Sequence, residues 1–245
     1  MQHLNQVKTK KLSKYPNILG VVLARGNSKG IKNKNLLKLN NKTLIDIAIS
    51  TSLKSKRINK LVFSSDSPKL INEAKKKIKV YFKRPKTLAT DKTSSFSVAK
   101  HAVKWIEKNQ KWKVDIVVIL SPTTPFRRAK DIDATIDLLI KKKVDSAITI
   151  TDPSYPPHWM FIKRKEKCKF LFPLGSKIQR RQDTPKVFQP AGMVYVIKKN
   201  FLFKMKGILP QKNTATLFIN KNRAINIDDK NDYMLAKINE KKINF

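Results

Sequence analysis

The stretch ILGVVLARGNSKGIKNKN, from Ile18 to Asn35, decides the fold of this chain. Its first part, ILGVVLA, is a short continuous apolar run, which is typical of a strand buried on both faces of a sheet. The second part is a polar loop that contains Gly26 and Gly30 and, among its cations, Arg25, Lys29 and Lys34. Backbone N–H groups and cations at the end of a buried strand favour a phosphate-binding loop. The spacing matches neither a Walker A loop nor the dinucleotide-binding pattern GxGxxG.

Apolar runs and stretches with helical spacing alternate through the rest of the chain. The runs predict further strands at 61–64, 116–120, 146–151, 193–197 and 224–227. Helices are predicted at 44–53, 68–77, 96–108, 131–141 and 229–239, with a short one after residue 197. Repeated strand and helix order predicts an α/β fold with a mostly parallel sheet, helices on both faces, and ligands at the carboxyl ends of the strands.

Composition limits the number of domains. The chain has 245 residues, of which 40% are hydrophobic, so we expect one main domain with a modest insertion. Residues 1–17 form a polar leader, and the main domain follows at 18–245. Pro153, Pro156 and Pro157 interrupt the regular pattern, so we expect an insertion or arm at about 152–190.

The formal net charge of +37 raises the question of a polyanionic partner. Of the 54 Lys and Arg residues, 9 are Arg, and the Lys residues are scattered through nearly every segment. This distribution favours a solvated basic surface that attracts nucleotides over a nucleic-acid interface. No apolar run is long enough for a bilayer span and the leader has no secretory pattern, so we expect a cytoplasmic protein without a membrane partner. Cys168 is alone, which excludes an internal disulfide.

Five segments, in order along the chain, resemble the CMP-sialic acid synthetase (acylneuraminate cytidylyltransferase) family, which includes the legionaminic and pseudaminic acid enzymes. They are ARGNSKGIKNKN (24–35), RPKTLATDKTSS (84–95), LSPTTPFR (120–127), RRQDTPKVFQPAGMVYV (180–196) and AINIDDKND (224–232). The resemblance implies a Rossmann-like nucleotidyltransferase fold with a small dimerisation arm, a homodimer, and a role in cell-surface polysaccharide or lipopolysaccharide synthesis. The implied reaction joins CMP from CTP to a nonulosonic acid and releases pyrophosphate.

The nucleotide half of the implied site matches the family well. The resemblance places Ala24, Arg25, Asn27, Ser28, Lys29, Gly30, Lys34, Asn35, Arg84, Ser94 and Ser95 at the nucleotide. It makes Arg25, Lys29 and Asp228 catalytic, and Lys29 is the first candidate for neutralising charge on the leaving pyrophosphate. Without the resemblance, Ser94 or Ser95 is an ordinary helix N-cap.

The implied cofactor is Mg²⁺, with Asp228 and Asn226 as the metal residues. Asn226 stands where the family has the first Asp of its metal-binding pair, and an amide oxygen is a neutral, weaker ligand. The alternative for Asp228 is an N-cap of the helix at 229–239.

The acceptor half departs from the family. The implied sugar-binding residues are Ser121, Thr123, Arg127, Arg180, Arg181, Gln182, Ala191 and Gly192. Ser121 replaces a family Gln and Ala191 replaces a common Asn, and both changes remove polar reach toward the sugar. The acceptor is therefore expected to be a variant nonulosonic acid such as legionaminic or pseudaminic acid. Arg180 and Arg181 suit a sugar carboxylate, or form part of a solvated basic loop.

Three alternatives stay open. One is another sugar nucleotidyltransferase of the same fold, such as a Kdo enzyme. The second is a family member that has lost activity, because Ser121, Ala191 and Asn226 all depart from the pattern. The third is a non-catalytic polyanion-binding protein that uses the charge alone.

Overall fold

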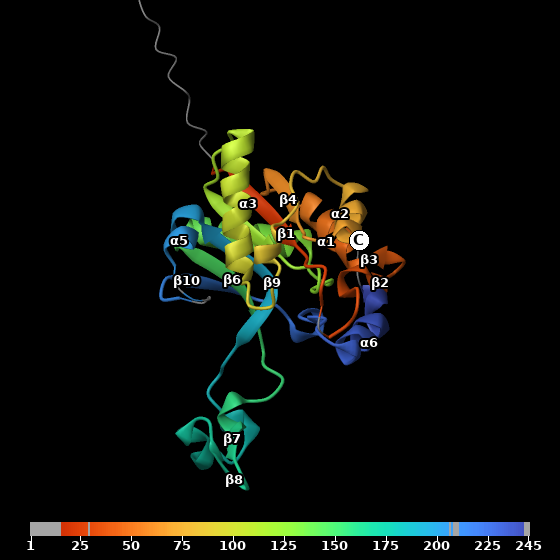
Figure 1. Ribbon diagram of the computed structural model, residues 1–245. Coiled ribbons are helices and arrows are strands. Elements are labelled where there is room, and N and C mark those ends of the chain that lie inside the picture. The colour runs from red at the N-terminus through yellow and green to blue at the C-terminus, as the bar shows by residue number, and fades with distance from the viewer. Residues whose placement is uncertain (1–15, 29, 206, 208–210, 243–245) are drawn as a thin grey trace, which may run out of the picture.

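The computed structural model describes residues 16–28, 30–205, 207 and 211–242. Its centre is a six-stranded sheet in the order β10-β6-β9-β5-β1-β4 (Figure 1). The strands are β1 (Ile18–Leu23), β4 (Lys60–Ser64), β5 (Ile116–Leu120), β6 (Ser146–Thr151), β9 (Gln189–Lys198) and β10 (Thr214–Phe218). β1 pairs in parallel with β4 and β5, and β6 with β10, whereas β9 runs antiparallel between β5 and β6. The predicted mostly parallel sheet is confirmed.

Helices cover both faces of the sheet. They are α1 (Leu44–Leu53), α2 (Pro68–Lys75), α3 (Ser95–Gln110), α4 (Ala129–Lys142), α5 (Lys199–Lys204) and α6 (Lys230–Ile238). Successive side chains of β1 point to opposite faces, as the period of two requires. Ile18 and Val22 pack with α1, α2 and α4, whereas Leu19 and Val21 pack with α3 and α5. The continuous apolar run thus becomes a strand buried on both sides.

One predicted strand, at 224–227, is wrong. This segment follows a short 3-10 helix, Lys221–Arg223, and leads into α6. Ile225 and Ile227 are buried in a third apolar cluster with residues of α1 and α6, and the Ile227 N–H donates to the carbonyl of Thr123. The sixth strand of the sheet is instead β10, which sequence analysis missed because its residues TATLF are half-exposed and partly polar.

The segment between β6 and β9 leaves the sheet as an arm, residues 152–188, which projects away from the sheet in Figure 1. It contains one antiparallel hairpin, β7 (Phe161–Arg164) with β8 (Lys167–Phe170), and several 3-10 turns. Thr151 pairs with Gln189 where the arm begins and ends. A second, smaller hairpin, β2 (Lys38–Leu39) with β3 (Lys42–Thr43), precedes α1.

The ends of the chain fall partly outside this description. Residues 1–15 of the predicted polar leader lie outside the described residues. None of the described helices has both the length and the apolar character that crossing a bilayer requires.

Two carboxylates that link elements of the fold titrate below their ordinary range. A hydrogen bond from Lys76 lowers the pKa of Glu73 and outweighs its burial. Burial opposes ionisation of Glu107, but hydrogen bonds from Lys199 and the Val114 N–H outweigh it, so the pKa of Glu107 is also lowered. Glu107 thereby ties α3 to the segment before β5 and to α5.

These pKa values predict loss of stability in acid. A carboxylate whose pKa is lower in the folded than in the unfolded chain stabilises the fold fully above its unfolded pKa, near 4.5, and loses this contribution as the pH falls through the folded value. The thermal unfolding midpoint is therefore expected to fall as the pH drops below about 4.5. Glu107→Gln should flatten that dependence, as measured by calorimetry from pH 3 to 7. Identical acid profiles for variant and wild type would contradict the prediction.

Candidate active site

A cleft of about 520 Å³ opens at the carboxyl ends of β1 and β5. Its walls come from the loop after β1, the segment 84–98, the turn after β5 and one residue before α6. The lining residues are Leu23, Ala24, Arg25, Ser28, Gly30, Lys34, Asn35, Arg84, Asp91, Thr93, Ser95, Val98, Ser121, Thr123 and Asp228. The cleft lies where parallel α/β sheets present their loops, and it brings together residues more than 200 positions apart in the sequence.

The loop after β1 is held against the rest of the cleft by its backbone. The Gly26 N–H donates to Asp66 over 3.0 Å, and the Asn35 side chain donates to the Arg25 carbonyl over 3.2 Å. A side chain at Gly30 would collide with the carbonyl oxygen of Asp228. Gly30 is thus needed for close packing of the loop on the segment before α6, which is a reason that the sequence alone did not reveal.

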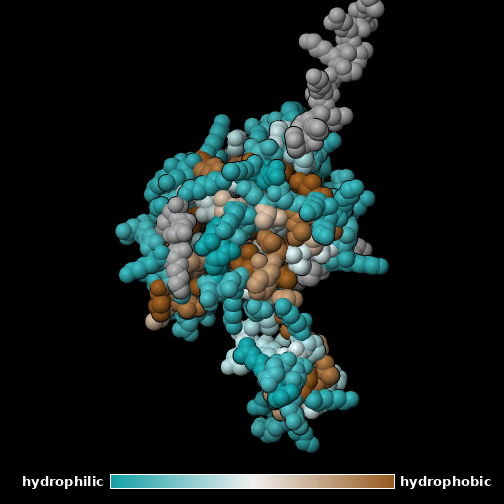
Figure 2. Space-filling view, turned by 180° about the vertical axis from the view of Figure 1, so that it is seen from behind, coloured by the Kyte–Doolittle hydropathy of each residue, from teal (hydrophilic) through white to brown (hydrophobic). Residues whose placement is uncertain are grey.

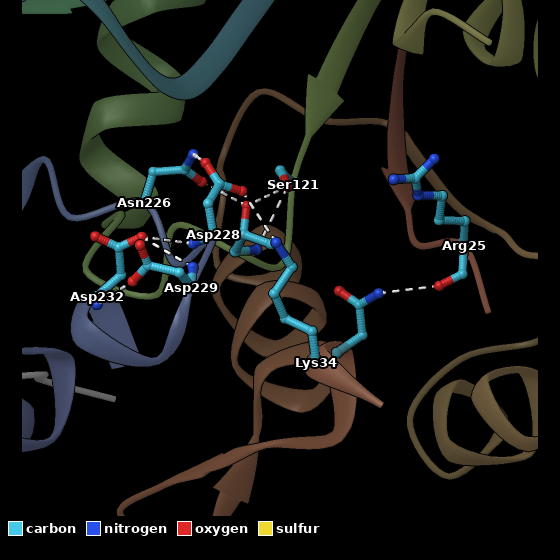
Figure 3. A network of polar contacts seen from close by, with 9 residues as sticks. Arg25, Lys34, Ser121, Asn226, Asp228, Asp229 and Asp232 are labelled. Carbon is cyan, nitrogen blue, oxygen red and sulfur yellow. Dashed lines mark hydrogen bonds and ion pairs between the residues drawn. The ribbon is translucent and has the colours of Figure 1, made fainter. Parts of the chain in front are cut away.

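Two cleft cations are each paired with a carboxylate. Arg25 contacts Asp91 over 2.6 Å, and Lys34 contacts Asp228 over 2.9 Å. The Lys34 side chain is 13% exposed, whereas that of Asp228 is 68% exposed. Figure 3 shows Lys34 reaching from the loop toward Asp228. Both cations lie where an anionic ligand in the cleft would meet them. Asp91 lies in segment 84–95, where no local pattern predicts its pairing with Arg25.

Asp228 also belongs to a polar network that starts at the end of β5. Ser121 hydrogen-bonds to Thr123, Thr123 donates to Asn226, and the Asn226 amide donates to Asp228. The backbone N–H of Asp228 donates to Asp232 over 2.9 Å. The N-cap of α6 is Asp229, whose side chain accepts from the Asp232 N–H, so the alternative of an Asp228 cap does not hold.

Arg84 lies beneath the cleft and joins two strands. It is 5% exposed, and its guanidinium donates to the carbonyls of Ala24 and Ser64 and to the Ser64 hydroxyl. Burial lowers the pKa of Arg84 to about 10; the charge of Asp66 opposes this shift and that of Arg25 adds to it. Arg84 therefore stays charged at neutral pH and contributes a buried positive charge to the floor of the cleft.

The start of α3 forms the opposite wall. Ser94 is its N-cap, and the Ser94 hydroxyl accepts from the Ser97 N–H over 3.1 Å. Ser95, the first residue of the helix, lines the cleft together with Thr93. The partial positive charge of this helix end faces the same space as the cations. Asn27 is exposed and is not among the lining residues. Lys29, the first catalytic candidate, lies outside the described residues.

The residues predicted to bind sugar do not gather in one place. Ser121 and Thr123 line the cleft. Arg127 is 4% exposed and donates to the carbonyls of Ser121 and Met193, so its side chain supports the cleft from behind and does not face it. Burial lowers the pKa of Arg127 to about 10.

The remaining predicted sugar-binding residues lie on β9 or the arm. Ala191 is buried, and Gly192 has a positive φ of 69° close to Thr124. Arg181 and Gln182 line a separate hollow of about 360 Å³ at the base of the arm, and Arg180 pairs with Asp183 over 2.8 Å. None of these five is a lining residue of the cleft. Among the described residues, most of those predicted at the nucleotide line the cleft, whereas of those predicted to bind sugar Ser121 and Thr123 do.

Comparison with known proteins shows which family the chain belongs to. Residues 19–229 match the model of the family described as Cytidylyltransferase. The chain belongs to the cytidylyltransferase family. As a member of this family, the protein is a nucleotidyltransferase, and the basic cleft at the end of β1 agrees with the binding of a nucleotide.

Named relatives of this cytidylyltransferase come from several bacteria. It is 28% identical to "Post-translational flagellin modification protein B" of Campylobacter coli over 229 residues, 92% of this chain and 97% of that protein. It is 27% identical to CMP-N,N'-diacetyllegionaminic acid synthase of Campylobacter jejuni over 90% of this chain and 93% of the relative. N-acylneuraminate cytidylyltransferase of Escherichia coli is also 27% identical over 92% of this chain, which covers 52% of that longer protein. The resemblance drawn from the five segments is confirmed.

Solved structures show the fold. The structure of a CMP:2-keto-3-deoxy-manno-octonic acid synthetase in complex with CTP superposes on this chain with a TM-score of 0.68 at 13% identity. The superposition covers 92% of this chain and 99% of the synthetase chain. A 4-diphosphocytidyl-2C-methyl-D-erythritol synthase from Anaerococcus prevotii gives a TM-score of 0.62, also at 13% identity, covering 91% of this chain and 95% of that one. The predicted nucleotidyltransferase fold is confirmed.

The donor set suits a magnesium ion that is shared with phosphates. Within the described ranges, no three His, Cys, Asp or Glu side chains gather as an all-protein metal cage. Mg²⁺ commonly keeps several waters and binds through one or two carboxylates plus substrate phosphates. Asp228 offers one exposed carboxylate at the cleft beside Lys34, which fits that mode.

Proposed function

We propose that this enzyme transfers CMP from CTP to the anomeric hydroxyl of a sialic-acid-like nonulosonic acid, giving a CMP-sugar and pyrophosphate. The observation that carries the proposal is the basic cleft after β1 in a chain of the cytidylyltransferase family. The names of the relatives support the acceptor class, because they include legionaminic, pseudaminic and N-acylneuraminic acid enzymes. Ser121 lines the cleft where the family has a longer Gln, which favours a variant acceptor such as a legionaminic or pseudaminic acid.

The cleft supplies charge where the reaction needs it. The sugar hydroxyl attacks the α-phosphorus of CTP, and negative charge builds on the leaving pyrophosphate. Arg25 and Lys34 line the cleft and would exchange their carboxylate partners for phosphate oxygens. Lys29 lies in the same loop by sequence and would add a third cation. Arg84 holds the Ala24 and Ser64 carbonyls and thereby keeps the ends of β1 and β4 in register.

The proposed cofactor is Mg²⁺, held by Asp228. When bound, it would supply Lewis-acid stabilisation of phosphate charge. Asp228 is suited to this role because Gly30 packs on its carbonyl and the Asn226 amide donates to its carboxylate. We place the reaction in the cytoplasm, where CTP is available, and its product would serve synthesis of a cell-surface polysaccharide.

Pyrophosphate release tests the reaction and names the acceptor. The purified protein is assayed with Mg²⁺ and each of CTP, ATP, GTP and UTP, against N-acetylneuraminic, legionaminic, pseudaminic and Kdo acids. Release with CTP and one nonulosonic acid, lost in Lys29→Ala, is the expected result. Release with Kdo alone would replace the acceptor class. A folded protein that is silent in every combination would refute the proposal and favour an inactive homologue or a polyanion-binding role.

We propose further that the arm joins two subunits. It exposes a cluster of apolar side chains, namely Tyr155, Met160, Phe161, Ile162, Leu171, Phe172 and Leu174, each between 38% and 72% exposed. Hydrophobic surface on the arm is visible in Figure 2. Exposed apolar clusters of this kind mark interfaces. A second copy of the chain is the proposed occupant, because Arg181 and Gln182 lie at the base of the same arm and are absent from the cleft of their own subunit.

A paired substitution tests the arm interface. Phe161→Asp with Phe172→Asp is expected to raise the dimer dissociation constant by about 100-fold or more in sedimentation velocity, because two charges would be buried in an apolar contact. Leu235→Asp, which alters a residue of α6 that is 48% exposed, is the matched control and should leave the dimer intact. A monomeric wild type, or a dimer unaffected by the arm pair, would refute the proposal.

A further inference from the structure

The Asn226 amide has two polar neighbours that fix which way it faces (Figure 3). Thr123 Oγ1 donates to Asn226 Oδ1 over 2.6 Å, and Asn226 Nδ2 donates to one carboxylate oxygen of Asp228. Reversal of the amide would place its oxygen against that carboxylate oxygen, and two acceptors repel each other. The neighbours therefore permit one orientation of the amide.

The hydroxyl of Thr123 is itself fixed from the other side. It lies 2.8 Å from the Ser121 hydroxyl. A hydroxyl has one proton, and Thr123 gives its proton to Asn226, so Ser121 donates to Thr123. The hydrogen bonds consequently run in one direction, from the end of β5 to the carboxylate of Asp228.

The second carboxylate oxygen of Asp228 accepts from Lys34 over 2.9 Å. The backbone on which the carboxylate sits is also held, because Ile227 N–H donates to the Thr123 carbonyl over 2.8 Å. One amide and one ammonium thus hold the carboxylate, and Lys34 balances its charge before any metal arrives.

We propose that Asn226 is a positioning residue that aims the Asp228 carboxylate, and is not a magnesium ligand. Both ends of its amide engage neighbours, Thr123 at the oxygen and Asp228 at the nitrogen, so the proposal replaces the expected ligand role of Asn226 with a positioning role. The protein then offers Mg²⁺ one carboxylate, already paired with Lys34, and the ion needs the phosphates of the nucleotide to complete its binding. This role of the nucleotide rests on the proposed function, whereas binding of free Mg²⁺ does not.

An Asp at position 226 would behave in the opposite way. It would keep the contact with Thr123 but place a second carboxylate oxygen against Asp228, where the amide now donates. Two adjacent carboxylates repel each other, and a divalent cation relieves that repulsion. The affinity of such a site for free Mg²⁺ rises with the number of carboxylates.

Metal binding without nucleotide is therefore the test. Asn226→Asp is expected to bind free Mg²⁺ about tenfold or more tightly than wild type in titration calorimetry, and its unfolding midpoint should rise with added MgCl₂. Asn222→Asp adds the same charge at an exposed position four residues earlier and should respond as wild type does. Equal Mg²⁺ affinity in wild type and Asn226→Asp would overturn the proposal.

A second variant tests positioning without adding charge. Thr123→Val removes the hydroxyl that orients the amide and keeps the side-chain volume. It should lower kcat/KM for CTP about tenfold and raise the Mg²⁺ concentration for half-maximal rate, while Thr123→Ser should restore both. An unchanged Mg²⁺ dependence in Thr123→Val would also overturn the proposal. If no acceptor supports turnover, the proposed function fails, but the calorimetric comparison of Asn226→Asp still decides the role of Asn226.

Discussion

Replacement of Asp228 by Asn is expected to lower kcat/KM for CTP by about 10²–10³-fold, the usual effect of removing one charged group that stabilises a transition state. The substitution preserves shape but leaves one oxygen, for either Lys34 or Asn226, and removes the negative charge proposed to hold Mg²⁺. The Asp228 side chain is 68% exposed, but Lys34 is 13% exposed and loses its partner, so the free energy of unfolding should fall by about 1 kcal/mol. Pyrophosphate release over a series of Mg²⁺ concentrations measures the effect.

The neighbouring Asp229 provides the control for this prediction. Asp229→Asn makes the same chemical change one residue later, at the N-cap of α6. Asn caps helices about as well as Asp, so both helix and activity should persist. Wild-type activity in Asp228→Asn, or equal losses in the two variants, would show that the Asp228 carboxylate has no specific role.

Replacement of Asp131 by Asn should produce the largest change in stability among the polar substitutions. The Asp131 side chain is 7% exposed, and its two oxygens accept from Arg223 over 2.9 and 3.0 Å. One oxygen also accepts from the Arg128 N–H at the start of α4. Loss of one partner of a buried pair leaves the other charge uncompensated, so the free energy of unfolding should fall by about 2–4 kcal/mol. Urea denaturation followed by circular dichroism measures it.

The same helix contains a control for the buried pair. Asp137 pairs with Arg57 over 2.8 Å, but both side chains are nearly half exposed. Asp137→Asn should therefore cost no more than about 1 kcal/mol. Because Arg223 lies three residues before Asn226, Asp131→Asn should also raise KM for CTP by loosening the segment that presents Asp228. Equal destabilisation by the two substitutions would contradict the assignment of Asp131 as an anchor.

The elements that sequence analysis located well are those whose signals are local. Helix α1 spans the predicted 44–53, and its first turn is capped by Thr43, whose side chain accepts from the Asp46 N–H. The run from Ile18 predicts a strand that is covered on both faces, and five consecutive residues of β1 are indeed buried. Strand β10 has no such run, and its place at the sheet edge depends on pairing with β6, about 68 residues away.

The candidate site divides along the same line. Sequence pattern predicted the loop cations, because charge at the end of a buried strand is a local signal, whereas the role of Asp228 was implied by the family resemblance alone. The ion pair of Arg25 with Asp91 and the anchor of Arg223 on Asp131 were missed, because each joins segments that are distant in sequence. Local sequence also does not tell whether a side chain faces the cleft. Ser121 lines the cleft, whereas Arg127, six residues later, is buried behind it.

Periodicity, caps and motifs lie in consecutive residues, so the sequence was enough to predict the order of most strands and helices, the loop after β1 and the cytidylyltransferase family. Only long-range contacts fix the packing of Gly30 against Asp228, the pairing of Arg25 and Lys34 with carboxylates, and the direction in which the Asn226 amide faces. These contacts arise where the carboxyl ends of parallel strands converge. Convergence there depends on the order and register of strands far apart in the chain, which no local pattern encodes.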